Sequence, residues 1–131
     1  MKNCHVCSTT LYPTLAGKFQ GRIRLEDELP VLVTVTVSSN QQRAQLRLSP
    51  ALLVKSSIFR FCRPPDPVYA TLLRTWDASG IDFAGYISLG TRRYETGVAI
   101  RQRTDYTQVL SIWLRPLHLH PSPRPRLEVV Q

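Results

Sequence analysis

Two segments of the chain place cations and apolar residues at alternate positions, which suits binding to a polyanion. The segments are 16–25 and 42–49. Alternate side chains of a β-strand point to opposite faces of a sheet, so the cations of both segments are expected on one outward face. Cations at this spacing can follow a phosphate backbone. The sequence therefore predicts a nucleic-acid-binding face made of Lys18, Arg22, Arg24, Arg43 and Arg47.

A second basic group flanks the segment 92–101. Arg92 and Arg93 begin this segment, and Arg101 and Arg103 stand at its far end. A hairpin with arginines at both ends is suited to wrapping a nucleic acid. A hairpin with a solvated surface accounts for the same residues equally well.

Aromatic residues near these cations are candidates for stacking on bases. Modules that bind single strands pair a basic groove with aromatic platforms. The candidates are Tyr86, Tyr94, Tyr106 and Trp113. Trp113 alternates with the apolar Ile112 and Leu114, so it is expected on the opposite face of its strand. Packing of Trp113 in a second small core or in a subunit interface is the alternative.

Cysteine and histidine residues near the two ends of the sequence give one candidate metal site. Cys4 and Cys7 have the Cys-x-x-Cys spacing of metal ligands, and His118 and His120 would supply two nitrogen ligands. Structural zinc needs four ligands, and one such cysteine pair is a weak signal for it. We therefore expect no metal and no other cofactor.

No catalytic signature accompanies these features. The sequence contains no glycine-rich phosphate loop and no carboxylate cluster of recognisable spacing. Cys62 has no local partner that would make it a nucleophile, and it is expected to be a small buried residue. We therefore expect neither enzymatic activity nor a small-molecule substrate.

The overall charge agrees with a polyanionic partner. The 131 residues carry a formal net charge of +8. Such a balance favours nucleic acid, although a solubilising surface explains it as well. No stretch of about 18 apolar residues predicts a membrane span. With no apolar signal segment and three cysteines, an odd number, a cytoplasmic or other intracellular location is expected.

The elements that would position these residues are mainly β-strands. Alternation predicts six strands at 16–25, 31–37, 42–49, 82–89, 92–101 and 106–114, and a further extended pair within 51–62. Asp66 and Pro67 resemble the start of a helix, and Gly80 resembles its C-terminal cap. Val68, Leu72 and Trp76 would form its apolar stripe. The pattern predicts a helix over 67–78, with another strand as the alternative.

This order predicts a mainly β fold, a small antiparallel barrel of about six strands with one helix. It is similar to an OB-fold with one extra strand, and a β-sandwich is the alternative. Residues 1–14 are expected to form an N-terminal arm, 15–116 the single barrel domain, and 117–131 a basic tail rich in proline.

The main functional hypothesis is a nucleic-acid-binding module for single-stranded DNA or RNA. Binding would use electrostatics and aromatic stacking. The alternative is a structural or assembly subunit of a larger complex. Its exposed apolar positions, Leu32, Trp113 and Leu117, would contact another protein or a second copy of the chain.

Overall fold

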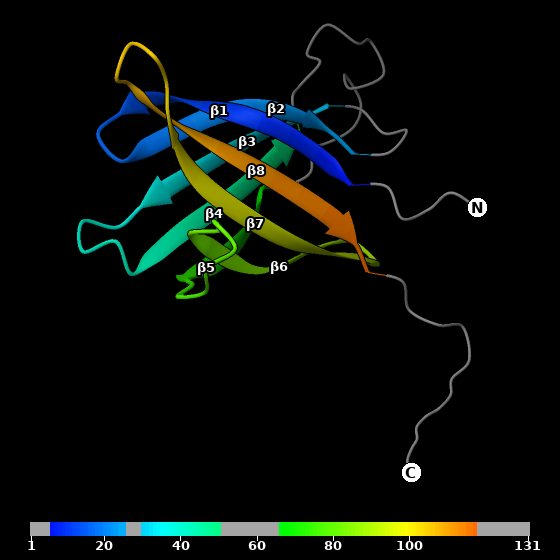
Figure 1. Ribbon diagram of the computed structural model, residues 1–131. Coiled ribbons are helices and arrows are strands. Elements are labelled where there is room, and N and C mark those ends of the chain that lie inside the picture. Colours follow the sequence, from blue (N-terminus) through cyan, green and yellow to red (C-terminus); the bar gives the residue numbers. More distant parts are fainter. Residues whose placement is uncertain (1–5, 26–29, 51–65, 118–131) are drawn as a thin grey trace, which may run out of the picture.

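The computed structural model describes residues 6–25, 30–50 and 66–117, and these residues form a closed antiparallel β-barrel. Each strand pairs with its neighbours in the sequence, and β8 pairs with β1 to close the ring. Figure 1 shows β7 and β8 crossing one side of the barrel and β3 to β5 on the other. The strands are β1 (Cys7–Leu15), β2 (Lys18–Arg24), β3 (Pro30–Val37), β4 (Arg43–Pro50), β5 (Val68–Arg74), β6 (Phe83–Leu89), β7 (Arg92–Gln102) and β8 (Gln108–Pro116).

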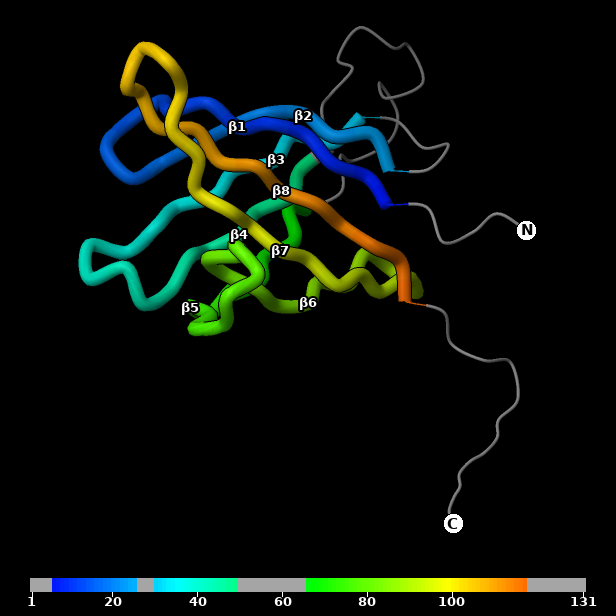
Figure 2. The backbone as a smooth tube through the Cα atoms, in the orientation of Figure 1, coloured from blue at the N-terminus to red at the C-terminus, as the bar shows by residue number. Residues whose placement is uncertain are grey.

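The two ends of the barrel differ in their connections. The turns 16–17, 38–42, 75–82 and 103–107 lie together at one end, which we call the turn end. In the tube drawing of Figure 2 this end is on the left. The chain enters β1 and leaves β8 at the opposite end, where Cys7 pairs with Leu114.

The barrel interior is filled by apolar side chains that alternate with outward residues along every strand. An eight-stranded barrel is just wide enough for its side chains to fill it. Gly21 and Gly85 also face inward, and each makes room for a leucine of the preceding strand. A Cβ on Gly21 would lie 2.7 Å from Leu11 Cδ2, and one on Gly85 would lie 2.8 Å from Leu72 Cδ2. The largest fully buried side chains are Tyr94, Phe83, Leu11, Leu25, Leu46, Leu48, Leu72, Leu110, Ile112, Leu114, Val33 and Val35.

The prediction of a small, mainly β antiparallel barrel is confirmed, but the helix over 67–78 is wrong. The segment Val68–Arg74 is β5, which pairs with β4 from Leu48↔Val68 to Arg43↔Leu73. Val68 and Leu72 are four residues apart, and this spacing puts two residues on one face of a helix and of a strand alike. Pairing with β4 therefore decides the conformation. The described residues contain no helix. They therefore contain no helix that is long and apolar enough to cross a membrane.

Other details of the expected architecture also need correction. The ring has eight strands instead of about six, and its closure excludes the β-sandwich. Its strands follow one another in sequence order, with β5 in place of the expected helix, so the order differs from that of an OB-fold. Residues 7–14 of the expected arm belong to β1 (Cys7–Leu15), whose pairing with β8 completes the ring. The expected extended pair within 51–62 and the tail beyond Leu117 lie outside the described residues.

Candidate nucleic-acid interface

The five cations predicted to share a face do share the outer surface of β2 and β4. The side chains of Lys18, Arg22 and Arg24 alternate along β2 with the buried Phe19 and Ile23. Arg43 and Arg47 alternate along β4 with the buried Ala44, Leu46 and Leu48. Strand β3 lies between them and pairs with both. We call the outer surface of β2, β3 and β4 the basic face.

The side chains of these five cations have no partner in the part of the chain that the structure describes. Among the described residues, none of them makes an ion pair, a side-chain hydrogen bond or a contact with an aromatic ring. Arginines elsewhere on the barrel do have partners. The Arg93 guanidinium lies 5.2 Å from the centroid of the Tyr86 ring, and Arg115 forms an ion pair with Glu95. A ligand would therefore meet the basic face without displacing an internal partner.

The basic face also lacks acidic residues. No Asp or Glu occurs in β2, β3, β4 or the adjoining β5. The carboxylates of the described residues lie elsewhere: Asp66 before β5, Asp77 and Asp82 in the turn 75–82, Glu95 on β7 and Asp105 in the turn 103–107. A surface of one charge sign attracts ligands of the opposite sign. Among the described residues, the basic face thus presents positive charge without a carboxylate on the same strands; Glu26, Asp27 and Glu28, between β2 and β3, lie outside these residues.

Two exposed tyrosines flank this face in a single cross-strand row. Tyr12 of β1 pairs with Gln20, Gln20 with Thr34, Thr34 with Arg47, and Arg47 with Tyr69 of β5. Tyr12 is 51% exposed and Tyr69 is 58% exposed. The Tyr69 ring is therefore accessible for stacking, and the Tyr12 ring is accessible where the Arg103 guanidinium, 5.8 Å from its centroid, leaves it exposed.

Sequence reasoning missed both tyrosines because it assigned their segments to an arm and to a helix. The signal was present, since Tyr12 follows the buried Leu11, and Tyr69 alternates with the inward Val68 and Ala70.

Of the aromatic residues predicted to stack on bases, Tyr94 is in the barrel core, so the prediction for this residue is wrong. Its side chain is 1% exposed, because it lies on the inward face of β7 with Thr96 and Val98. A buried ring in the core is unavailable to a base. Tyr86 and Tyr106 are exposed, on β6 and in the turn 103–107 respectively.

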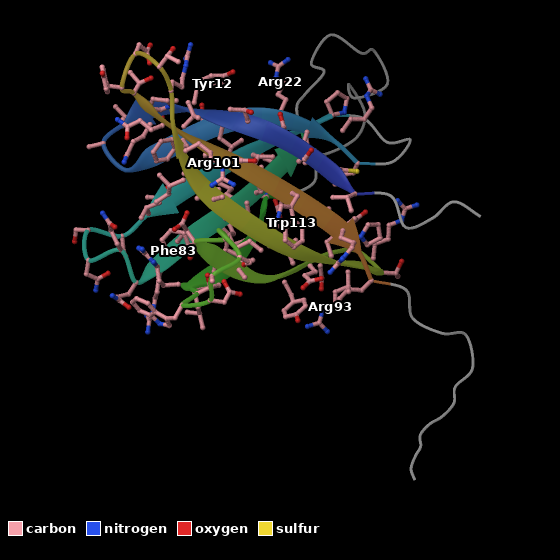
Figure 3. All side chains as sticks on the ribbon, in the orientation of Figure 1. Tyr12, Arg22, Phe83, Arg93, Arg101 and Trp113 are labelled. Atoms are coloured by element: carbon pink, nitrogen blue, oxygen red, sulfur yellow. The ribbon has the colours of Figure 1, made fainter. Side chains whose placement is uncertain are left out.

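Trp113 is neither in the barrel core nor fully exposed. It lies on the outer surface of β8, and its indole covers Gly97 on the neighbouring strand β7. The Arg115 guanidinium lies 5.7 Å from the ring centroid. Figure 3 shows Trp113 and Arg101 on the side of the barrel formed by β7 and β8. Trp113 is therefore packed against its own sheet, away from the basic face.

The second basic group does not join the first. Strand β7 is four strands away from β3 in a ring of eight, so the two lie on opposite sides of the barrel. Arg92 and Arg93 stand at one end of β7, while Arg101 stands near the other, with Arg103 just beyond it. Arg103 contacts Asp105 at 3.9 Å and lies over the Tyr12 ring. These four arginines form two separate groups.

Of the four candidate metal ligands, Cys7 alone lies within the described residues. Cys7 is 5% exposed and points into the barrel core. Cys4, His118 and His120 lie outside the described residues. Within 6–25, 30–50 and 66–117, no three His, Cys, Asp or Glu side chains form a group that could hold a metal ion.

Comparison with known proteins gives no relative to set beside this geometry. No protein-family model, no curated protein and no solved structure matches the chain. The functional argument therefore depends on the residues of the barrel alone.

The exposed apolar residues differ from those expected. Leu32, Trp113 and Leu117 are half-buried. The large apolar side chains that are most accessible on β5, β6 and the turn between them are Tyr69, Leu73, Trp76 and Tyr86.

Proposed function

We propose that the protein binds single-stranded DNA or RNA on its basic face, without catalysing a reaction on it. The observation that carries the proposal is a set of five cations that, within the described part of the chain, have no side-chain partner and share strands without a carboxylate. Contacts from such side chains to phosphates give affinity that does not depend on base sequence. Tyr12 and Tyr69 would add stacking at the two edges of the face.

The curvature of the face favours a single strand over a duplex. Consecutive strands of a closed ring of eight turn by about 45° on average, so the outward directions of β2 and β4 differ by about 90°. A flexible single strand can follow such a convex surface and reach both rows of cations. A duplex is stiff over about 150 base pairs and would contact a narrower strip.

A salt titration of binding to a fluorescent oligonucleotide tests the proposal. For a single strand, the slope of log affinity against log salt changes by about 0.7 for each phosphate contact. Replacement of Arg22, Arg24, Arg43 and Arg47 with alanine should therefore flatten the slope by about 2.8. Stability should change little, because each side chain is at the surface and unpaired.

The second basic group supplies a control of equal charge. Replacement of Arg92, Arg93, Arg101 and Arg103 with alanine removes the same net charge from β7, on the opposite side of the barrel, and from the turn 103–107, where Arg103 lies over the Tyr12 ring. This control should retain most of the slope. An unchanged slope in the first variant, or an equal loss in both, would exclude the basic face as the specific site.

A structural or assembly subunit is the second candidate, and the exposed apolar side chains around β5 and β6 favour it. Leu73 is 57% exposed, Trp76 is 78% exposed and Tyr86 is 53% exposed. Association through these residues would resist salt, because apolar burial involves no counterion release. Sedimentation at high salt, with Leu73→Asp as the variant, separates this candidate from the first.

A further inference from the structure

A hollow of about 410 Å³ opens at the turn end of the barrel. Three hairpins, β1–β2, β3–β4 and β7–β8, contribute its walls. A volume of this size is within the range of sites that hold small organic groups. Its lining residues are Ala16, Gly17, Phe19, Val37, Ser38, Ser39, Gln41, Ile100 and Gln108.

The lining of the hollow is apolar in its depth and polar at its rim. Phe19 is buried, and Val37 and Ile100 pack against the barrel core, so these three form the floor. Gln41 and Gln108 are exposed and bring amide groups to the rim. No other described residue makes a hydrogen bond to the side-chain amide of Gln108. A flat ring with donors and acceptors on its edge matches this combination.

Cations adjoin the hollow through its lining residues. Lys18 stands between Gly17 and Phe19. The backbone carbonyl of Arg43 accepts a hydrogen bond from the Ser38 hydroxyl at 3.0 Å. Both Lys18 and Arg43 belong to the basic face, so the hollow lies at one end of that face.

Two more arginines and one carboxylate lie near the rim. Arg74 donates a hydrogen bond to the Gln41 carbonyl at 3.3 Å, and Arg101 follows Ile100. The Asp82 carboxylate accepts a hydrogen bond from the Ile100 amide at 2.7 Å. This carboxylate is therefore already engaged by the backbone.

We propose that the hollow binds the base of one nucleotide, while Lys18 and Arg43 contact its phosphate. The proposal rests on the proposed function, since it assigns one nucleotide of the bound strand to a defined pocket. Base contacts inside the pocket would come from the floor and from the amide of Gln108. A free mononucleotide carries the same base and phosphate, so the experiment compares a nucleotide within a strand with a free mononucleotide.

The experiment uses the fluorescent base 2-aminopurine, placed in turn at each position of a ten-nucleotide oligothymidylate. Gln108→Phe fills the hollow from its rim. Gln102→Phe is the matched control, because Gln102 is the exposed cross-strand partner of Gln108 and does not line the hollow. Adenosine monophosphate is the mononucleotide probe, and melting temperatures show whether both variants remain folded.

A change in 2-aminopurine fluorescence at one position is expected with the unaltered protein. Gln108→Phe should abolish this change and weaken oligonucleotide affinity by about tenfold, with the salt slope retained. Gln102→Phe should leave both unchanged.

Each other outcome separates the two proposals. Salt-dependent oligonucleotide binding with no position that depends on Gln108 would overturn the pocket and leave the basic face. Binding of adenosine monophosphate that Gln108→Phe removes, without oligonucleotide binding, would assign the hollow to a free nucleotide and overturn the strand proposal. Absence of binding to both probes would overturn both.

Discussion

The contact between Trp113 and Gly97 predicts that Gly97→Ala destabilises the protein when Trp113 is present and stabilises it when Trp113 is replaced by alanine. A Cβ added to Gly97 would lie 2.6 Å from Trp113 Cε2 and 2.9 Å from Nε1. These distances are shorter than a normal contact, so the indole must move if Gly97 becomes alanine. A large side chain that covers a glycine on the neighbouring strand is a known means of stabilising a sheet.

The magnitudes follow from the area that the indole covers. A tryptophan buries about 150–250 Å² when fully enclosed, and most of Trp113 is buried. At about 25 cal/mol per Å² its removal should cost about 3–4 kcal/mol. This lies toward the lower end of the range of about 3–5 kcal/mol for a tryptophan in a core. Gly97→Ala should cost about 1 kcal/mol, because the displaced indole loses more than the strand gains.

In the Trp113→Ala variant, the indole that a Cβ at position 97 would meet is absent. Gly97→Ala should then stabilise the protein by about 0.5–1 kcal/mol, since glycine within a strand is unfavourable relative to alanine. The coupling energy of the double-mutant cycle would be about 2 kcal/mol.

Urea unfolding followed by far-ultraviolet circular dichroism measures all four proteins without relying on tryptophan fluorescence. Oligonucleotide affinity should be unchanged in Trp113→Ala, because Trp113 lies away from the basic face. A destabilising effect of Gly97→Ala in both backgrounds, of equal size, would refute the reasoning.

Three further predictions concern single side chains. Thr96 is fully buried and its hydroxyl has no partner among the described residues, so Thr96→Val should raise the free energy of unfolding by about 1 kcal/mol in urea titrations; a loss of similar size would contradict this. The hydrogen bond from the Thr107 side chain, with a further one from its backbone, lowers the pKa of Asp105 below 3.8. The stabilisation of the folded protein by these hydrogen bonds is therefore present above the pKa of Asp105 in the unfolded chain, and it is lost as the pH falls through the pKa in the folded protein. Thr107→Val should raise this pKa in a carboxyl-carbon NMR titration, and an unchanged midpoint would refute the assignment. Tyr94→Ala should destabilise the fold by about 3–5 kcal/mol, whereas Tyr69→Ala should weaken oligonucleotide binding with little effect on stability; the reverse pattern in melting and binding assays would exclude the assigned positions.

The sequence alone determined the strands in which apolar and polar residues alternate clearly. The core positions Val33 and Val35 and the outward arginines of β2 and β4 follow from a period of two, which the pleat of a strand imposes. The candidate basic face was predictable for this reason. Its freedom from internal partners was not, because pairing depends on residues distant in the sequence.

Tertiary structure decided the elements for which local signals were ambiguous. Val68 and Leu72 satisfy a helix and a strand equally, and only hydrogen bonding to β4 selects the strand. Cys7 and Leu11 are too few apolar residues to identify β1 alone, yet its pairing with β8 closes the barrel.

Closure of the ring also decided what lies together on the surface. It separates the arginines of β7 from the basic face and brings Tyr12 and Tyr69 to its edges. It also gathers three hairpins around one hollow. Alternation fixes which face of a strand a side chain occupies, whereas strand order and register fix its neighbours.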